Sequence, residues 1–201
     1  GTILLPTLSK YDLNFEREQF ILSIQKGQRF VLFIGVPSLI GLFFCSEDLI
    51  STIFYRGAFT ASDVINSSYS LMALSFGLPF FMLMKVLTPA FFARKDTKTP
   101  MYVALISLII NAVLNYYLAF ILNYGHVGIA VGSSIAAIVS VCILEILLYR
   151  DGFIKIKNIF NKFNLNIVIS SLFVIVFLYF CTSKINFIEI SQSERIVFLL
   201  I

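Results

Sequence analysis

A single lysine, Lys85, interrupts a long apolar stretch between residues 67 and 93. It lies nine residues before Arg94, or roughly 13 Å along a helix, so a membrane-spanning helix would hold it near the middle of the bilayer. A lysine at that depth costs about 2.5–3.5 kcal/mol on insertion scales, and its stem does not easily reach an interface. We therefore expect Lys85 to face the interior of a helical bundle or a water-filled cavity.

Two asparagines, Asn111 and Asn115, lie four residues apart in the next apolar stretch and therefore share one helix face. Their amides suit an interhelical hydrogen-bonded pair or, through their oxygens, a site for a hard cation such as Na⁺. Ser133 lies among small residues in the following apolar segment, where a neighbouring helix can approach closely, and is a candidate third ligand. The sequence leaves both interpretations open.

Two further charged residues are candidates for a cavity or gate. Arg94 ends the stretch that contains Lys85, and Glu145 lies about 7 Å inside the end of its own stretch. Glu145 could pair with Lys85 or with a helix absent from the chain, form a local salt bridge, or lie at the interface. Pro79 and Pro89 remove hydrogen bonds and predict a bent helix, which suits a moving or cavity-lining element as well as simple packing.

The chain lacks the residue groupings of an enzyme. It has no nucleophile–base pair, no paired carboxylates, no metal-ligand cluster and no glycine-rich phosphate loop. His126 lies in a short turn and is expected to be solvated, and Cys45, Cys142 and Cys181 are spaced as small buried apolar residues rather than as disulfide or zinc ligands. We therefore predict no catalytic residue, no cofactor, no metal beyond a candidate Na⁺ coupling ion, and no ATP hydrolysis by this chain.

The elements that must position these side chains follow from the composition. Of 201 residues, 59% are hydrophobic and 13% charged, whereas soluble domains have about 45–50% apolar and about 25% charged residues. Mean hydropathy is +0.93 and net charge is +4. These values exclude a disordered chain, a disulfide scaffold and an ordinary cytosolic enzyme, and they predict an integral membrane protein without a nucleic-acid partner.

Apolar runs long enough to cross a bilayer as helices recur along the chain. They lack the period-two alternation of a membrane β-barrel. The sequence therefore predicts an all-α, polytopic bundle with about five full and two partial transmembrane helices. The full spans are expected at about Phe30–Ile53, Ser67–Ala93, Met101–Leu122, Gly128–Tyr149 and Leu165–Cys181, with a helix end at Gly1–Leu8 and a truncated helix from Arg195. Both ends of the chain look cut.

The loops give the orientation of these spans. Eleven cations fall in alternate loops on one side and three on the other, with Lys85 as the remaining one. The positive-inside rule assigns the eleven to the cytoplasm. The segment from Lys10 to Arg29 contains charges of both signs with apolar residues between them. It is predicted to be an amphipathic helix on the cytoplasmic surface before the first span.

Four segments together resemble a known family. They read GTILLPTLS at residues 1–9, FYRGAFT at 54–60 with Asp63, GLP at 77–79, and KVLTPAFFARKDTKTP at 85–100. The segment at 85–100 is the most specific of the four. Residues that resemble the family are frequent from Gly1 to about Leu148. In these residues the chain resembles the MurJ (MviN) family, the lipid II flippases of bacterial cell-wall synthesis.

The resemblance implies a fourteen-helix flippase of the multidrug/oligosaccharidyl-lipid/polysaccharide (MOP) superfamily, with a MATE-like fold of two bundles around a cationic cavity. Residues 1–149 would form part of the second bundle, from the end of helix 8 to helix 12. Residues 150–201 would form a cytoplasmic loop and the C-terminal helix pair, which holds the lipid tail. The implied location is the bacterial cytoplasmic (inner) membrane, where the chain would need the missing N-terminal half of the same protein.

The implied function is transport of the peptidoglycan precursor lipid II, an undecaprenyl-pyrophosphate-linked disaccharide-pentapeptide, from the cytoplasmic to the periplasmic leaflet by alternating access. Family arginines that bind the headgroup would lie outside this chain. Some members bind Na⁺ through an Asn and an Asp four apart on the eleventh helix. Asn111 and Asn115 match that placement, although Asn at the second position lacks the carboxylate charge.

Two other functions are weighed against the lipid II flippase. One is a related exporter of another polyprenyl-linked oligosaccharide, and the other is a structural membrane subunit without transport activity. The segment from Lys85 to Pro100 favours the lipid II flippase, because a structural subunit needs no lysine in the middle of the membrane.

Overall fold

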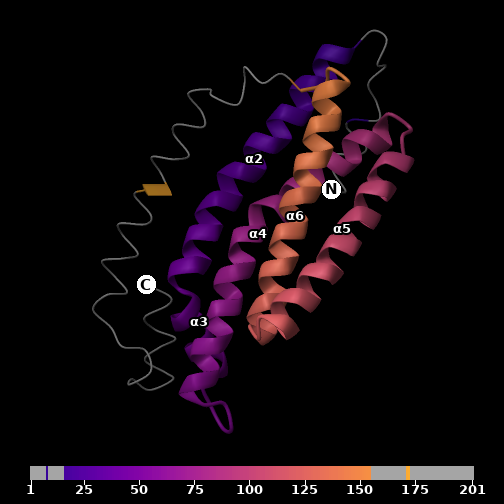
Figure 1. Cartoon of the computed structure of the whole chain (residues 1–201). Helices are drawn as coiled ribbons and strands as arrows, with labels where there is room; N and C mark the ends of the chain where they lie inside the picture. The colour runs from indigo at the N-terminus through magenta and orange to yellow at the C-terminus, as the bar shows by residue number, and fades with distance from the viewer. Residues whose placement is uncertain (1–7, 9–15, 155–170, 173–201) are drawn as a thin grey trace.

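Four long antiparallel helices form the computed structural model of the chain, which describes residues 8, 16–154 and 171–172 (Figure 1). The helices alternate in direction, so that α2 begins, α4 ends, α5 begins and α6 ends at the same end of the bundle. The elements are α2 (Arg17–Phe44), α3 (Ser46–Phe54), α4 (Ala61–Ala93), α5 (Lys98–Tyr116), the short π-helix η1 (Tyr117–Ile121) and α6 (Gly125–Arg150). The all-helical, polytopic prediction is confirmed for these residues.

Four helices are long and apolar enough to span a membrane, namely α2, α4, α5 together with η1, and α6. They correspond to the first four predicted spans. The predicted fifth span, the truncated helix from Arg195 and the helix end at Gly1–Leu8 lie outside the described residues, except for Leu8, Ser171 and Leu172. The proposed boundary between a bundle and a C-terminal helix pair therefore stays a prediction.

The first predicted span has the wrong bounds. Helix α2 runs without a break from Arg17 to Phe44, so residues 17–29 are its first turns rather than a separate helix on the membrane surface. The chain breaks at Cys45, and α3 carries Glu47 and Asp48 as a separate short helix. The charged residues of the first turns lie at the end of the bundle that gathers the other cations, so one helix holds both the polar segment and the apolar run.

Helix α4 lies between α2 and α6, and α5 contacts mainly α6. The shared core concentrates in the half of the bundle where α2 begins and α4 and α6 end. Its largest fully buried side chains include Phe20, Ile24, Leu87, Phe91 and Leu148. Most other apolar side chains point outward, as a bilayer permits, and α5 buries only Pro100 and Val103.

Small residues bring the helices together. A Cβ atom on Gly77 of α4 would lie 2.7 Å from the Ser134 hydroxyl of α6, and one on Gly128 of α6 would lie 2.7 Å from the Leu118 backbone carbon of η1. Close approach at small residues is the usual way in which membrane helices pack. Gly128 in the fourth predicted span therefore serves contact with η1, whereas the contact between α4 and α6 uses Gly77 in the second predicted span.

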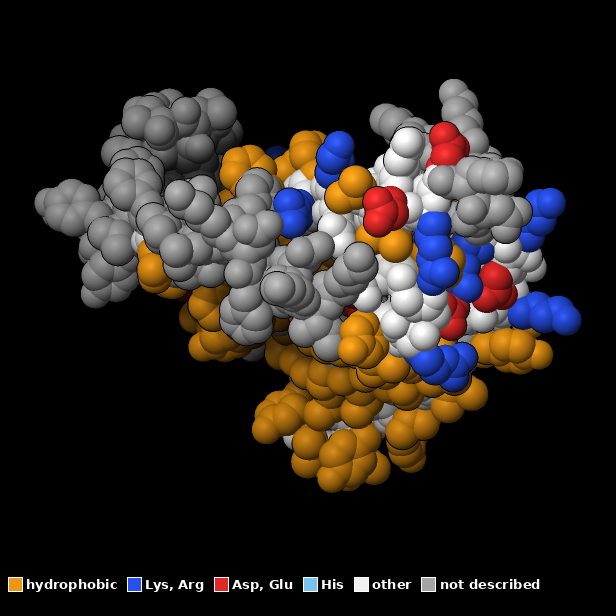
Figure 2. All heavy atoms as spheres, turned by 90° about the horizontal axis from the view of Figure 1, so that it is seen from above, with side chains coloured by type: hydrophobic (Ala, Val, Ile, Leu, Met, Phe, Trp, Pro, Cys, Tyr) orange, Lys and Arg blue, Asp and Glu red, His pale blue; other side chains and the backbone are white. Residues whose placement is uncertain are grey.

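Charged side chains gather at one end of the bundle. Figure 2 looks onto the end at which α4 and α6 end, and shows Lys, Arg, Asp and Glu side chains together there, above a flank covered by apolar side chains. This is the end that the cation count of the loops assigns to the cytoplasm. We refer to it as the cytoplasmic end and to the opposite end as the outer end.

Candidate functional site

Lys85 lies on an open face of α4. It is exposed and shares this face, at helical spacing, with the exposed side chains of Leu74, Phe81 and Phe92. It makes no hydrogen bond or ion pair with another described residue. Lys85 does not face the interior formed by the four described helices, and the alternative, a water-filled cavity, stays a prediction. Because an unpaired ammonium is unfavourable in hydrocarbon, this face of α4 requires a polar environment.

Glu145 of α6 does not pair with Lys85. Its carboxylate accepts a hydrogen bond from the Gln28 side chain of α2, and both residues are partly buried. The interaction joins α2 to α6, so the pairing with Lys85 is wrong, and contact with a helix outside the chain stays a prediction. Gln28 carried no signal in the sequence, because it belongs to the segment assigned to a surface helix.

Asn111, Asn115 and Ser133 come together between α5 and α6. The Asn111 amide donates to the Ser133 hydroxyl at 3.2 Å, and the Asn115 amide donates to the Asn111 side-chain oxygen at 2.8 Å. Gly132 makes this possible, since a Cβ atom there would collide with the Asn115 side-chain oxygen. We call these three polar residues the asparagine cluster.

The asparagine cluster has a second hydrogen-bonding arrangement. With its amide reversed, Asn115 donates to the backbone oxygens of Asn111 at 3.3 Å and of Ile129 at 3.2 Å, and it turns its side-chain oxygen toward Asn111. The amide is then satisfied by backbone groups, and its oxygen enters the cluster. The hydrogen bond from Asn111 to Ser133 agrees with the interhelical interpretation, and the set of neutral oxygen ligands stays a prediction. Among the described residues, no group of three or more His, Cys, Asp or Glu could hold a metal ion.

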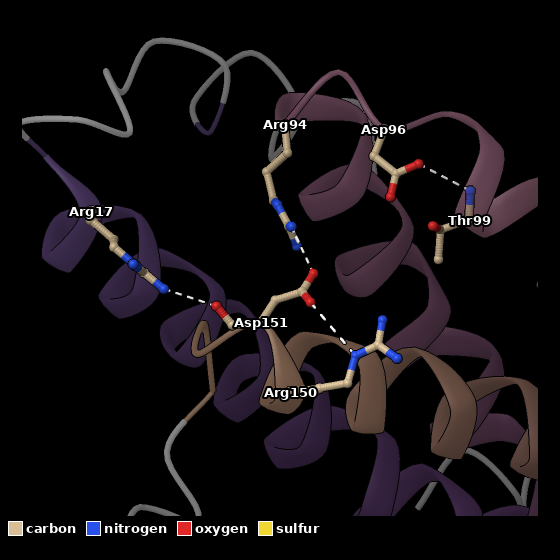
Figure 3. Close-up of polar contacts among 6 residues, drawn as sticks. All are labelled: Arg17, Arg94, Asp96, Thr99, Arg150 and Asp151. Carbon is tan, nitrogen blue, oxygen red and sulfur yellow. Dashed lines mark hydrogen bonds and ion pairs between the residues drawn. The ribbon is translucent and has the colours of Figure 1, made fainter.

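Arg94 takes part in a group of charged residues at the cytoplasmic end (Figure 3). One of its guanidinium nitrogens lies 2.7 Å from the Asp151 carboxylate, with side-chain exposures of 17% and 30%. Arg17 of α2 donates to the Asp151 backbone oxygen at 2.8 Å, and Arg150 lies 4.0 Å from the carboxylate. One aspartate after α6 therefore ties together the start of α2 and the end of α4.

Phe153 completes this group. Its ring lies between two guanidinium groups, with the central carbon of Arg17 at 4.6 Å and that of Arg94 at 4.2 Å from its centroid. Phe20 meets the same ring edge to face at 5.5 Å. Cations over an aromatic face are attracted by its electrons, more strongly where water is excluded. We call Arg17, Arg94, Asp151 and Phe153 the arginine clasp.

Most of the arginine clasp could not be predicted from the sequence. Arg94 is a candidate gate residue from the sequence, but Arg17, Asp151 and Phe153 are far from it in the chain, and nothing in their local pattern sets them apart. A second nitrogen of Arg94 is buried without a hydrogen-bond partner among the described residues. The guanidinium is thus held on one edge by Asp151 and on its face by Phe153.

Asp96 caps the start of α5 beside the clasp. Its carboxylate accepts the Thr99 backbone N–H at 3.0 Å, and this hydrogen bonding to Thr99 lowers the pKa of Asp96. The preceding Lys95 has a left-handed backbone with φ of 60°. The loop between α4 and α5 is therefore a tight, capped turn that leaves the Lys95 and Lys98 side chains exposed.

The remaining candidates occupy structural positions. Pro79 and Pro89 are buried inside α4, which is helical through both, and a Cβ atom on Gly35 of α2 would lie 3.3 Å from Pro79. His126 is exposed, and its ring nitrogen lies 3.2 Å from the Asn66 backbone oxygen. The expectation that Cys142 is buried is wrong, because it is exposed on α6.

Comparison with known proteins supplies evidence beyond this geometry. The model of a family described as lipid II flippase MurJ matches residues 1–198. A probable lipid II flippase MurJ of Vibrio cholerae is 40% identical over 152 residues, which are 76% of this chain and 29% of the relative. One from Rickettsia prowazekii is 42% identical over 141 residues, 68% of this chain and 27% of the relative. The chain thus spans about three tenths of the length of these relatives.

A solved structure gives the same result for the fold. A lipid II flippase MurJ in an inward closed conformation aligns with 99% of this chain and 39% of its own, with a TM-score of 0.75 and 28% sequence identity. The likeness therefore extends over nearly the whole chain and matches only part of the larger transporter.

Proposed function

The chain belongs to the MurJ family of lipid II flippases, and from this premise we propose that it forms part of a transporter that flips lipid II. In this proposal the transporter moves the lipid-linked peptidoglycan precursor from the cytoplasmic to the periplasmic leaflet by alternating access. The chain is a multi-pass membrane protein, and its proposed location is the bacterial inner membrane. The activity is transport rather than catalysis.

The observation that carries the proposal is the unpaired charge of Lys85 on an open face of α4. A pyrophosphate that crosses hydrocarbon must lose its hydration, which is prohibitive for an unpaired anion. A cation at the same depth offsets part of that loss, while the isoprenoid tail stays in lipid. Lys85 is suited to this role, because no other described side chain neutralises it and its face cannot lie against hydrocarbon alone.

The test is complementation in a full-length protein that carries this segment. Lys85→Ala is expected to abolish growth when the resident flippase is depleted, whereas Lys85→Arg keeps the charge and is expected to restore it. Lys26→Ala is the control, because Lys26 is an exposed lysine on a different helix, α2. Normal growth of the Lys85→Ala strain at normal expression would contradict the role of Lys85.

We further propose that the asparagine cluster binds Na⁺ as a coupling ion. Support comes from the grouping of the Asn111, Asn115 and Ser133 side chains, which together carry three neutral oxygen atoms. The ligands are neutral, so the bound ion keeps its full charge and binding is expected to be weak. Asn115→Ala should remove any Na⁺ dependence of lipid II binding, and Asn115→Asp should strengthen it. An unchanged Na⁺ dependence in the Asn115→Ala variant rejects the ion site.

A further inference from the structure

A groove on the flank of the bundle lies between α4 and α5, with a volume of about 460 Å³. Met84, Thr88 and Phe92 form one wall at helical spacing, Met101 and Ala104 lie on the opposite wall, and Leu144 of α6 also lines it. From Met84 to Phe92 the groove extends about 12 Å along α4. Thr97 lines its cytoplasmic mouth, so the groove runs from the interface into the depth of the membrane.

The groove has the chemistry of a site for a hydrocarbon chain. Its lining is almost wholly apolar, and the polar side chains among the named residues are threonine hydroxyls. Water finds few partners in such a hollow, and apolar cavities stay dry. The two methionines are flexible, polarizable side chains that adapt to an irregular ligand. The adjoining face of α5 is exposed and apolar, as at Leu105 and Leu108, so the groove continues a surface that lipid can cover.

The mouth of the groove adds a headgroup contact. Lys95 and Lys98 are exposed there, and Arg94 lies at the end of α4. Asp96 is the acidic residue of this turn, and its carboxylate is already engaged by the Thr99 N–H. The mouth also coincides with the N-terminal end of α5, the positive end of the helix dipole. Anionic lipids of the cytoplasmic leaflet attract such cations, by about 1 kcal/mol for each lysine or arginine near the surface.

We propose that this groove is a binding site for an anionic phospholipid, with one acyl chain between α4 and α5 and its phosphate beside Lys95 and Lys98. Charge complementarity at the mouth and a dry channel along the membrane normal together select this occupant. Phe92 lies on the same face of α4 as Lys85, but the proposed site uses neither the Lys85 charge nor the asparagine cluster, and its test measures lipid labelling rather than transport.

The test uses the full chain in phosphatidylcholine vesicles that contain a phosphatidylglycerol with a photoreactive diazirine in one acyl chain. After illumination, labelled peptides are mapped by mass spectrometry. Labelling is expected to concentrate on the segments around Met84–Phe92 and Met101–Ala104. Ala104→Phe fills the groove and should abolish this labelling, whereas Ala112→Phe, at an exposed alanine two turns further along α5, should leave it unchanged.

The headgroup contact is tested by a charge change. Lys98→Gln should lower the labelling by phosphatidylglycerol about fivefold, and the matched Lys26→Gln variant should not. A photoreactive phosphatidylcholine with the same chains is expected to label the groove weakly. Since Lys98→Gln alters only an exposed side chain, it keeps the proposal testable even where Ala104→Phe disturbs folding.

Three results would overturn the proposal. Even labelling along α5, or labelling that survives Ala104→Phe, would show only general contact with lipid. Equal labelling by the two headgroups would remove the anionic selectivity. Displacement of the label by equimolar undecaprenyl pyrophosphate would assign the groove to an isoprenoid chain instead. None of these results affects the complementation test of Lys85, so the two proposals fail separately.

Discussion

The arginine clasp and the asparagine cluster lie at different depths of one bundle and hold their polar groups in different ways. In the clasp, full charges at the cytoplasmic end are paired with a carboxylate and stacked on an aromatic ring. In the cluster, about 20 Å along α5 from Lys98, neutral amides and a hydroxyl bond to one another. Charge is kept at the interface, and neutral polar groups are kept within the span.

Lys85 departs from this division. It carries a full charge within a spanning helix and has neither a carboxylate nor an amide partner among the described residues. The comparison therefore singles out Lys85 as the polar residue whose position does not stabilise the bundle. The charge of Arg94 is paired with Asp151 and the polar groups of the cluster bond to one another, whereas Lys85 has no charged or hydrogen-bonding partner among the described residues, and this is why the proposed transport role rests on it.

Breaking the ion pair of the clasp should have the largest effect. Asp151→Ala leaves the mostly buried Arg94 guanidinium without its carboxylate, and removal of one partner of a buried pair is strongly destabilising. We expect a loss of about 2–3 kcal/mol in the free energy of unfolding, less than for a fully buried pair because both side chains retain some exposure. Denaturant unfolding of the chain in detergent micelles measures it.

The double variant Arg94→Met with Asp151→Ala serves as the control for this prediction. It removes both charges, so much of the lost stability should return. A double variant as unstable as Asp151→Ala alone would show that the pair itself is not the source of the loss.

Crowding the asparagine cluster should have the next largest effect. Gly132→Ala places a methyl group against the Asn115 side chain and forces it out of the cluster. We expect a loss of about 1–3 kcal/mol from overpacking. Gly41→Ala in α2 is the matched control, since a Cβ atom there has no neighbour within 4 Å and alanine favours helix. Equal stability of the two variants would mean that the close packing at Gly132 is not required.

Removing the aromatic ring of the clasp sharpens the comparison further. Phe153→Leu keeps an apolar side chain but loses the stacking with Arg17 and Arg94, for an expected destabilisation of about 1–2 kcal/mol. Thermal unfolding monitored by circular dichroism gives the change. Phe120→Leu is the control, because Phe120, at 71%, is the most exposed large apolar side chain among the described residues. A similar loss in both variants would count against the stacking.

The smallest effect concerns pH at the interface. Hydrogen bonding to Thr99 lowers the pKa of Asp96, so its contribution to stability is present above the pKa of an unfolded aspartate and is lost as pH falls through the lower folded value. We expect the Thr99 amide to exchange with solvent more readily, relative to neighbouring amides, as the pH falls through this range. Hydrogen exchange measures it, and Asp96→Ala should remove the pH dependence. A pH response that persists in this variant would assign the effect elsewhere.

Much of the fold could be predicted from sequence because its signals are local. The apolar runs around residues 67–93 and 128–149 predicted helices that the structure contains, and the alternation of cations in the loops predicted which helix ends share a side. Asn111 and Asn115 could be placed on one face from their spacing alone. Their partner Ser133 was a candidate because small residues permit close approach.

The errors had a common cause. The charges between residues 17 and 29 lowered local hydropathy, and this suggested a surface helix where α2 is continuous. Depth along α4 was estimated well enough to single out Lys85, but depth does not tell which face of the helix meets its neighbours. Hydropathy measures how readily a segment leaves water. It contains no information on which other residues a side chain contacts.

The sequence by itself determined the class of the protein, the number of spans within residues 16–154 and their alternating direction, because a bilayer imposes these on any sufficiently long apolar helix. Only the tertiary structure decided which residues from different helices form hydrogen bonds and ion pairs. Arg17 and Asp151 are 134 positions apart, and Gln28 and Glu145 are 117 positions apart. Such contacts depend on which helix faces meet at small residues, and this packing is a property of the whole bundle rather than of any one segment.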